Sequence, residues 1–321
     1  MGTKPGTIVL SSAPAVIRVL SARRRRGLLT FLLGAACMLA VPAAHAAIMY
    51  VSSGTQSIVQ VTPTGVVSPF ATLPHNSYPF GLAFDGSGTL YAADNGTDQI
   101  SKITSGGVVS LFATLPGGSN PFGLAFDGSG NLYVAERSAD QISKITPGGA
   151  VSLFATLPGA SFPYGLAFDG SGNLYVADSH TDQISKITPG GMVSLFATLP
   201  ANSLPDGLAF DASGNLYASG AISDQISKIT ALGVVSLFAT LPDSSYPQGL
   251  AFDSSGNLYV AEDNLSQISM ISTDGSTATP LATVSGPQFI AFAPVPEPSS
   301  AVLLAVVAGS LLLRRRRRSL A

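Results

Sequence analysis

Short apolar stretches recur along the middle of the chain at a fixed interval of 42 residues. The segment GLAFD begins at Gly81, Gly123, Gly165, Gly207 and Gly249. The segment NLYVAD and its close variants keep the same interval, with tyrosines at Tyr91, Tyr133, Tyr175, Tyr217 and Tyr259. A weaker copy of the first segment, FIAFA, begins at Phe289, and a copy of the second surrounds Tyr50. A fixed period of this length predicts a repeat architecture.

The pattern within each repeat predicts four short strands. GLAFD and NLYVAD are separated by DGSGN or a close variant, a glycine-rich sequence typical of hairpin turns. QISKIT and VSLFATLP follow, mostly separated by a Pro-Gly-Gly or Ser-Gly-Gly turn, and a loop ending in proline leads to the next repeat. The region has no apolar pattern of helical period. Four antiparallel strands in each repeat of about 40–50 residues indicate a propeller blade.

The ends of the repeat region predict six blades in a closed ring. The chain enters on a second strand at residues 48–51 and leaves on a first strand at residues 289–293. We expect the last strand to complete the blade that the N-terminal strand begins, because closure leaves no unpaired strand at the seam. An open β-solenoid is the alternative. The expected fold is therefore all-β, a six-bladed β-propeller spanning residues 47–293.

The net charge of −2 conceals a strong segregation of charges. Eleven of the 16 lysines and arginines lie before residue 27 or at 314–318. Residues 47–313 hold five lysines and arginines against 18 acidic residues, a net charge of −13. A body of this charge repels nucleic acid and anionic lipid headgroups. We therefore expect no nucleic-acid partner.

Residues 1–46 carry the features of an export signal. Four arginines at 23–26 precede an apolar run of 15 residues at 27–41, and Ala44, His45 and Ala46 fit the small-x-small cleavage pattern. We predict a signal peptide and a mature chain that begins at Ala47. Both the general secretory and the twin-arginine export routes stay open. The single cysteine, Cys37, lies in this segment, so disulfides play no part in the mature chain.

The C-terminal segment 294–321 combines three features in order. Pro296, Glu297 and Pro298 precede 13 small or apolar residues at 301–313, and five arginines follow. A helix of 13 residues is about 20 Å long, which makes a marginal anchor in a hydrocarbon core of ~30 Å. The segment closely resembles the PEP-CTERM sorting signal of Gram-negative bacteria, with an ordinary tail anchor as the alternative.

The PEP-CTERM resemblance implies a localisation and several partners. It implies a single transmembrane helix held transiently in the inner membrane and processed by an exosortase-type protease. The propeller would then be exported and delivered to the cell envelope or the exterior. Proteins with this signal are commonly associated with exopolysaccharide and biofilm production, so a polysaccharide is the ligand class that the resemblance implies.

The repeat resembles two kinds of known propeller. GLAFDGSGNLYVAD is similar to the NHL repeat, and its continuation into QISKITPGG is similar to streptogramin (virginiamycin B) lyase-type propellers. The second resemblance implies paired histidines and a glutamate on one face of the ring. The body holds only His75 and His180, in loops of different type. We therefore assign no catalytic residue and favour a non-catalytic protein, with a lactonase- or lyase-like enzyme as the alternative.

A resemblance to gluconolactonase-like propellers implies a calcium ion on the axis, so the repeated acids need a role. One set ends the second strands, about one strand spacing of ~4.8 Å outside the innermost strands: Asp94, Glu136, Asp178 and Glu262. The other set opens the DGSGN-type turns and is placed to bond turn backbone: Asp85, Asp127, Asp169, Asp211 and Asp253. Calcium needs six to eight converging oxygens. We predict structural roles for both sets, with no metal and no cofactor.

The two faces of the expected ring differ in how much their connections vary. One face carries near-identical turns, whereas the other carries varied loops, which often hold binding residues. On the varied face we single out the residue before each innermost strand, at the mouth of the central channel: Phe80, Phe122, Tyr164, Asp206, Gln248 and Gln288. Three aromatic and three polar residues suit a sugar chain, which has apolar faces and hydroxyl edges. The alternative is that the aromatic rings only plug the channel. The predicted function is an exported, non-catalytic binding or structural module.

Overall fold

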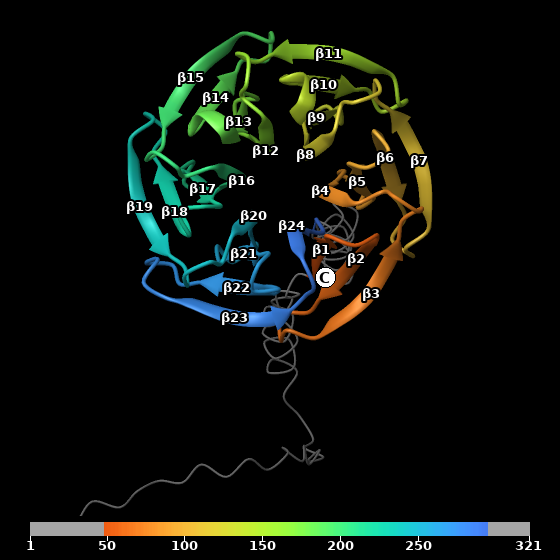
Figure 1. Ribbon diagram of the computed structural model, residues 1–321. Helices are drawn as coiled ribbons and strands as arrows, with labels where there is room; N and C mark the ends of the chain where they lie inside the picture. The colour runs from red at the N-terminus through yellow and green to blue at the C-terminus, as the bar shows by residue number, and fades with distance from the viewer. Residues whose placement is uncertain (1–47, 295–321) are drawn as a thin grey trace, which may run out of the picture. The chain divides into compact units, whose positions relative to one another are not determined.

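Six antiparallel sheets of four strands each surround a common axis (Figure 1). The computed structural model describes residues 48–294. The predicted signal peptide, its cleavage site and the sorting signal therefore lie outside the described residues. The all-β, six-bladed propeller predicted from the 42-residue repeat is confirmed. No helix within residues 48–294 is long and apolar enough to cross a membrane.

Each blade consists of four strands that run from the axis outward, and we number the blades in chain order. Blade 1 is formed by β24 (Pro287–Phe292), β1 (Met49–Ser53), β2 (Ser57–Val61) and β3 (Val67–Thr72). Blade 2 is formed by β4 (Pro79–Phe84), β5 (Leu90–Asp94), β6 (Gln99–Ile103) and β7 (Val109–Thr114). Blade 3 is formed by β8 (Pro121–Phe126), β9 (Leu132–Glu136), β10 (Gln141–Ile145) and β11 (Val151–Thr156).

The other three blades repeat this arrangement. Blade 4 is formed by β12 (Pro163–Phe168), β13 (Leu174–Asp178), β14 (Gln183–Ile187) and β15 (Val193–Thr198). Blade 5 is formed by β16 (Pro205–Phe210), β17 (Leu216–Gly220), β18 (Gln225–Ile229) and β19 (Val235–Thr240). Blade 6 is formed by β20 (Pro247–Phe252), β21 (Leu258–Glu262), β22 (Gln267–Ile271) and β23 (Ala278–Thr283).

The seam closes between the first and last strands of the propeller. β24 pairs antiparallel with β1, with Met49 opposite Phe292 and Tyr50 opposite Ala291. Blade 1 therefore takes its innermost strand from the C-terminal end of the ring and its other three from the N-terminal end. The predicted ring closure is confirmed.

The hydrophobic core is divided into layers between adjacent blades. In one layer Tyr91 and Ile100 of blade 2 pack with Leu132 of blade 3, and Ile100 and Leu132 are fully buried. The Tyr91 ring makes edge-on contacts with Phe112 and Phe126, with centroids 4.9 and 5.1 Å apart. Both faces of each sheet are covered in this way, so each blade depends on its two neighbours for burial of its apolar side chains.

The innermost strands need glycine because neighbouring blades approach closely at the axis. A Cβ at Gly123 would meet the carbonyl oxygen of Tyr164 and lie 3.1 Å from the backbone nitrogen of Leu166 in the next blade. Equivalent overlaps arise at the matching glycines of blades 2, 4, 5 and 6. The repeated Gly of GLAFD thus sets how tightly the ring closes around its axis.

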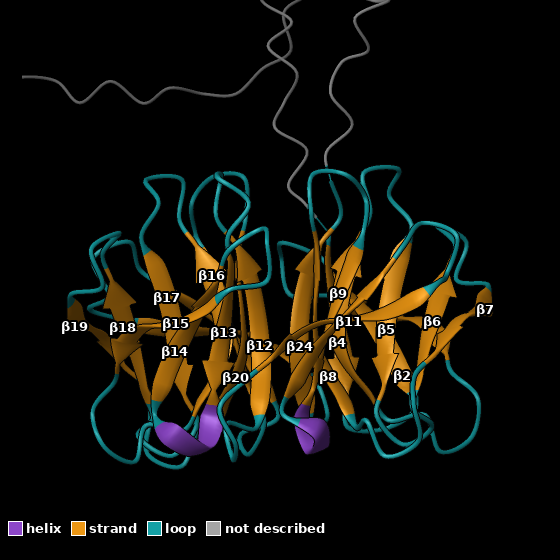
Figure 2. Cartoon of the chain, turned by 90° about the horizontal axis from the view of Figure 1, so that it is seen from above, coloured by secondary structure: helices purple, strands orange, loops and turns teal. Residues whose placement is uncertain are grey.

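The two faces of the ring carry different connections. Figure 2 shows both single-turn 3-10 helices, η1 (Arg137–Ala139) and η2 (Ser179–Thr181), at the same edge of the ring. We call this the loop face, since it carries the connections from second to third strands and from blade to blade. We call the opposite side the turn face, since it carries the repeated tight turns.

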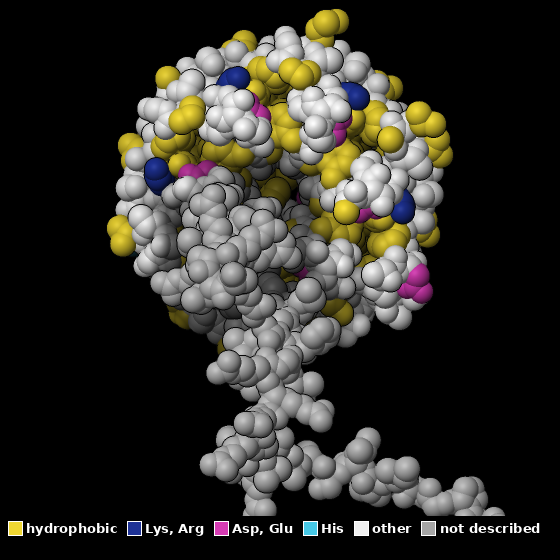
Figure 3. Space-filling model, turned by 180° about the vertical axis from the view of Figure 1, so that it is seen from behind, with side chains coloured by type: hydrophobic (Ala, Val, Ile, Leu, Met, Phe, Trp, Pro, Cys, Tyr) yellow, Lys and Arg dark blue, Asp and Glu magenta, His cyan; other side chains and the backbone are white. Residues whose placement is uncertain are grey.

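The turn aspartates have the structural role expected of them. Asp127 Oδ1 accepts hydrogen bonds from the backbone N–H groups of Ser129 and Asn131, both at 2.9 Å. Burial acts to raise the pKa of Asp127, but hydrogen bonds led by those from Asn131 outweigh it, so the pKa lies below its usual value. Lys144 Nζ lies 4.0 Å from Asp127 Oδ2 and 5.4 Å from the Tyr133 ring centroid. Figure 3, which views the ring from behind, shows lysine and acidic side chains close together at intervals around this face.

Candidate functional site

The six candidate residues form one ring around the axis, which we call the axial ring. Each is the second residue of an innermost strand, because those strands begin one residue earlier, as at Pro79 and Pro121. The sequence placed them just before the strands, and that placement was wrong by one position. The cause is the proline that opens each strand, whose carbonyl side already belongs to the sheet edge. The axial ring lies toward the loop-face end of the innermost strands.

Three aromatic side chains of the axial ring pack against one another. The ring centroids of Phe80 and Phe122 are 4.4 Å apart, and those of Phe122 and Tyr164 are 4.3 Å apart. Phe122, in the middle, is buried, whereas Phe80 and Tyr164 are half-buried. One half of the axial ring is therefore an aromatic surface whose two flanking residues still reach solvent.

The other half of the axial ring is polar and buried. The exposed fractions of Asp206, Gln248 and Gln288 are 1%, 5% and 5%. Asp206 Oδ1 accepts a hydrogen bond of 3.1 Å from Ser179 Oγ, and burial raises the pKa of Asp206 to about 7. The Oε1 atom of Gln248 is buried with no hydrogen-bond partner among residues 48–294. Unsatisfied buried acceptors are costly, which makes this half of the axial ring a strained polar environment.

Arg137 is a further member of this site that the sequence did not identify. It begins η1 on the loop face of blade 3, and its guanidinium carbon lies 5.6 Å from the Phe122 ring centroid and 5.3 Å from that of Tyr164. The electrostatic field of Arg137 also acts on the pKa of Asp206, so these charges are neighbours. The available signal was that Arg137 is the one cation of the body that is not a repeat lysine. Its contact with the following blade could not be read from the sequence.

The rim of the loop face is held in a strained backbone conformation. Non-glycine residues with positive φ recur two residues before the axial ring, at Tyr78, Asn120, Phe162, Leu204 and Tyr246. Asp140 holds one such segment by accepting hydrogen bonds of 2.8 Å from the backbone N–H groups of Ala160 and Phe162. Conformations of this kind persist where the surrounding structure enforces them, often around binding sites. The rim is therefore a fixed surface around the axial ring.

The acids that end the second strands lie in the blades and away from the axial ring. Their side chains are buried and each keeps one oxygen without a partner among the described residues: Asp94, Glu136, Asp178 and Glu262. Burial raises the pKa of Asp94 and Asp178 to about 7, while hydrogen bonds from Ser101 and Ser185 act in the opposite direction. Within residues 48–294, no three His, Cys, Asp or Glu side chains are grouped so that they could hold a metal ion.

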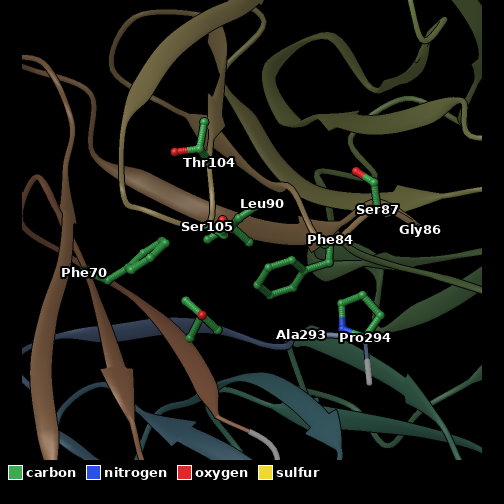
Figure 4. A pocket seen from close by; sticks show the side chains of 11 residues that line it. Phe70, Phe84, Gly86, Ser87, Leu90, Thr104, Ser105, Ala293 and Pro294 are labelled. Carbon is green, nitrogen blue, oxygen red and sulfur yellow. The ribbon is translucent and has the colours of Figure 1, made fainter. Parts of the chain in front are cut away.

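A large cavity lies elsewhere, at the seam between blades 1 and 2. It has a volume of about 690 Å³, and Figure 4 shows Phe70 and Phe84 beside it, with Pro294 at one side. It exists because β24 and β1 are not joined by a turn, so Ala293 replaces the turn aspartate of other blades. In its place Gln60 Nε2 donates a hydrogen bond of 2.9 Å to the Tyr50 hydroxyl. None of the residues that line the cavity is charged, so it offers no acid–base chemistry.

The two histidines of the described chain do not form a pair. His75 lies in the link from blade 1 to blade 2, whereas His180 lies in η2 of blade 4. Both are exposed, and the imidazole of His180 packs against the Phe162 ring with centroids 5.2 Å apart. The described residues thus provide no pair of histidines for acid–base catalysis.

Comparisons with known proteins identify relatives of the fold. A family model described as the virginiamycin B lyase family matches residues 30–271. Among solved structures, a streptogramin B lyase shares 20% sequence identity and a TM-score of 0.62, over 79% of this chain and 92% of that chain. A virginiamycin B lyase from Staphylococcus aureus shares 19% identity and a TM-score of 0.59, over 80% and 87%. A propeller in a nidogen/laminin complex shares 20% identity and a TM-score of 0.66, over 77% and 98%. No curated protein sequence matches.

Proposed function

This chain belongs to the virginiamycin B lyase family, and we propose that it acts as a non-catalytic module that binds a saccharide at the axial ring. The observation that carries the proposal is the division of that ring. Phe80, Phe122 and Tyr164 form a contiguous aromatic surface. Asp206, Gln248 and Gln288 supply acceptors and donors on the opposite half. Aromatic faces stack on the apolar faces of sugars, and the amide and carboxyl groups bond their hydroxyl edges.

The variation among blades supports a binding role. Most of each 42-residue repeat is nearly identical from blade to blade, including the core strands and the turn face. The axial ring and the loop face break that identity, although they stand on the same scaffold. Binding residues are commonly placed on loops that a rigid scaffold positions. The blade-specific residues thus gather where one ligand can contact several blades at once.

An enzyme of lyase or lactonase type is the second candidate, and two observations favour it. The family and two of its structural neighbours are named as lyases. Asp206 also has a pKa of about 7 beside the axial ring, which suits a general acid or base. Against it, residues 48–294 provide no histidine pair, and Asp206 is almost fully buried. We place the binding role first for that reason.

The cellular setting is part of the proposal. The N-terminal features favour export across the inner membrane, and Pro296, Glu297 and Pro298 favour transient anchoring and cleavage by an exosortase-type protease. The propeller would then reach the cell envelope or the exterior of a Gram-negative bacterium. There it would meet exopolysaccharide and the biofilm matrix, which supplies saccharide chains as ligands.

A screen of the full chain for binding and for turnover tests this proposal. The purified protein is titrated with neutral and acidic polysaccharides and incubated separately with lactones and a streptogramin B. We expect saturable binding to at least one polysaccharide and no turnover. Turnover that the substitution Asp206→Asn abolishes would establish the enzyme instead. An absence of binding across the polysaccharide panel would contradict the proposed function.

A further inference from the structure

Arg137 occupies a position that differs in every blade. It is the fourth residue after the repeat tyrosine, where the second strand gives way to the loop face. The residues at this position are Gly54, Asn95, Arg137, Ser179, Ala221 and Asp263. Only Arg137 brings a permanent positive charge. The other four cations of the described chain are the repeat lysines, each of which lies over the tyrosine of its own blade.

The guanidinium of Arg137 lies over aromatic rings of two blades. Its carbon Cζ is 5.1 Å from the Phe162 ring centroid, 5.3 Å from that of Tyr164 and 5.6 Å from that of Phe122. These rings stabilise the cation through their π faces and fix its position beside the axial ring. The backbone is fixed as well, because Arg137 N–H donates a hydrogen bond of 3.2 Å to the carbonyl oxygen of Asn120.

The polar edge of this guanidinium has no partner in the described chain. The Nε–H group is buried without an acceptor. No carboxylate among residues 48–294 lies within 4.0 Å of Arg137, since the one ion pair found there joins Lys144 and Asp127. A buried donor without an acceptor costs about 1–3 kcal/mol. An acceptor supplied by a ligand would remove that cost.

We infer that Arg137 binds a carboxylate of the ligand, so that the saccharide taken at the axial ring contains a uronic acid. This inference rests on the proposed function and names its ligand class. The planar fork of a guanidinium matches a carboxylate with two parallel hydrogen bonds. The sugar ring that bears the carboxylate stacks on the half-buried rings of Phe80 and Tyr164. Hydroxyls farther along the chain reach Asp206 and Gln248.

The charge of the whole body limits which acidic ligands fit. Residues 47–313 carry a net charge of −13, so a densely charged polyanion is repelled as it approaches. Screening confines that repulsion to about 8 Å at physiological ionic strength. An isolated carboxylate that reaches Arg137 within the rim is affected less. The site therefore selects a sparsely carboxylated saccharide.

A matched pair of disaccharides tests the inference on the full chain. One is glucuronosyl-β1,4-glucose and the other is cellobiose, which differs by lacking the carboxylate. We expect the acidic disaccharide to bind at least about tenfold more tightly, as a charged hydrogen-bonded pair implies. In Arg137→Asn, which copies Asn95 of blade 2, this preference should disappear. Arg137→Lys keeps the charge without the fork and should retain part of it.

The control variant is Lys144→Gln. It removes the same unit charge from the same blade, and it copies Gln60 of blade 1. Its preference should match that of the unmodified protein, and thermal unfolding should confirm that all variants are folded. Equal affinity for both disaccharides, or a preference that survives in Arg137→Asn, would overturn the inference. The same holds if neither disaccharide binds while polysaccharides do; in each of these cases the binding function stands. If no saccharide binds at all, both proposals fail.

Discussion

The hydroxyl of Ser52 joins the two ends of the propeller. Its Oγ accepts a hydrogen bond of 3.0 Å from Phe289 N–H, 237 residues away in the sequence, and donates one of 2.6 Å to the carbonyl oxygen of Phe80 in blade 2. Ser219 makes the equivalent pair of bonds in blade 5, with Gly207 and Gln248. The seam is thus closed by side-chain hydrogen bonds as well as by the β1–β24 ladder.

Removal of the closing strand should destroy the cooperative unfolding of the ring. Deletion of residues 286–294 leaves β1 without its partner and exposes the core layers on either side of blade 1. Ser52→Ala should cost about 1–3 kcal/mol, because it leaves a buried backbone N–H without its acceptor. Ser110→Ala removes an exposed hydroxyl and should change stability by about 0.5 kcal/mol or less. Chemical denaturation measures all three, and unchanged stability in the deletion would refute ring closure.

The two kinds of repeat glycine should respond differently to alanine. Gly123→Ala places a methyl group against the backbone of blade 4 and should destabilise the protein by about 1–3 kcal/mol or more. Gly128→Ala, in the turn of the same blade, meets no atom within 4 Å and should be tolerated. Thermal unfolding of the two variants checks this. Equal melting temperatures would show that the innermost strands are not packed as closely as described.

The fold was predictable because the repeat states each structural requirement six times. Turn chemistry, the apolar pattern and the matched incomplete ends all agree, so strands, blade number and closure followed from the sequence. The turn aspartates were also predictable, since their bonds are local. The seam cavity was not, because it arises where two strands distant in the sequence meet without a turn.

The candidate site was predictable only in part. The six residues of the axial ring were recognised because they break the repeat, although their place inside the strands was missed by one residue. Arg137 was missed because its partners, Phe162 and Tyr164, belong to the next blade. Contacts between blades depend on loop conformation, including the positive φ of Phe162. A periodic sequence does not encode such contacts in its spacing.

Stability should fall as the pH rises from about 4 to 7. The folded-state pKa of Asp94 and Asp178 is about 7, above the value of 3.8 without burial. The folded state therefore binds these protons more tightly, and the stabilisation is full below pH 4 and lost as the pH passes 7. The loss is at most about 4 kcal/mol per carboxyl at about 1.4 kcal/mol per pKa unit. Denaturation at several pH values measures it.

Variants should separate this effect from other acids. Asp94→Asn and Asp178→Asn should each flatten the decline between pH 4 and 7. Asp274 is exposed, and hydrogen bonds led by that from Ser272 lower its pKa to about 2, so its contribution is lost only as the pH falls below about 4. Asp274→Asn should leave the slope between pH 4 and 7 unchanged. A stability that rises over that interval would contradict the assignment.

Sorting should depend on the three residues that precede the C-terminal apolar segment. We predict that replacing Pro296, Glu297 and Pro298 with alanine leaves the protein in the inner membrane with its C-terminal tail uncut. The apolar segment and the arginines are kept, so insertion itself should be unaffected. Cell fractionation and mass spectrometry of the C-terminus check this. The same processed terminus as in the unmodified protein would sink the sorting proposal.

The most direct test of the axial ring as a binding surface compares two double variants of the full chain. Phe80→Ala with Tyr164→Ala removes the solvent-reaching aromatic rings, and Leu111→Ala with Leu153→Ala removes two outer-strand side chains that are each 60% exposed. The measurement is the affinity for glucuronosyl-β1,4-glucose by titration calorimetry, after thermal unfolding shows that both variants are folded. We predict a loss of at least about tenfold in the axial variant, as for stacking worth more than about 1.4 kcal/mol, and none in the outer-strand variant. An axial variant that loses stability but binds as tightly as the unmodified protein would show that these rings only plug the channel.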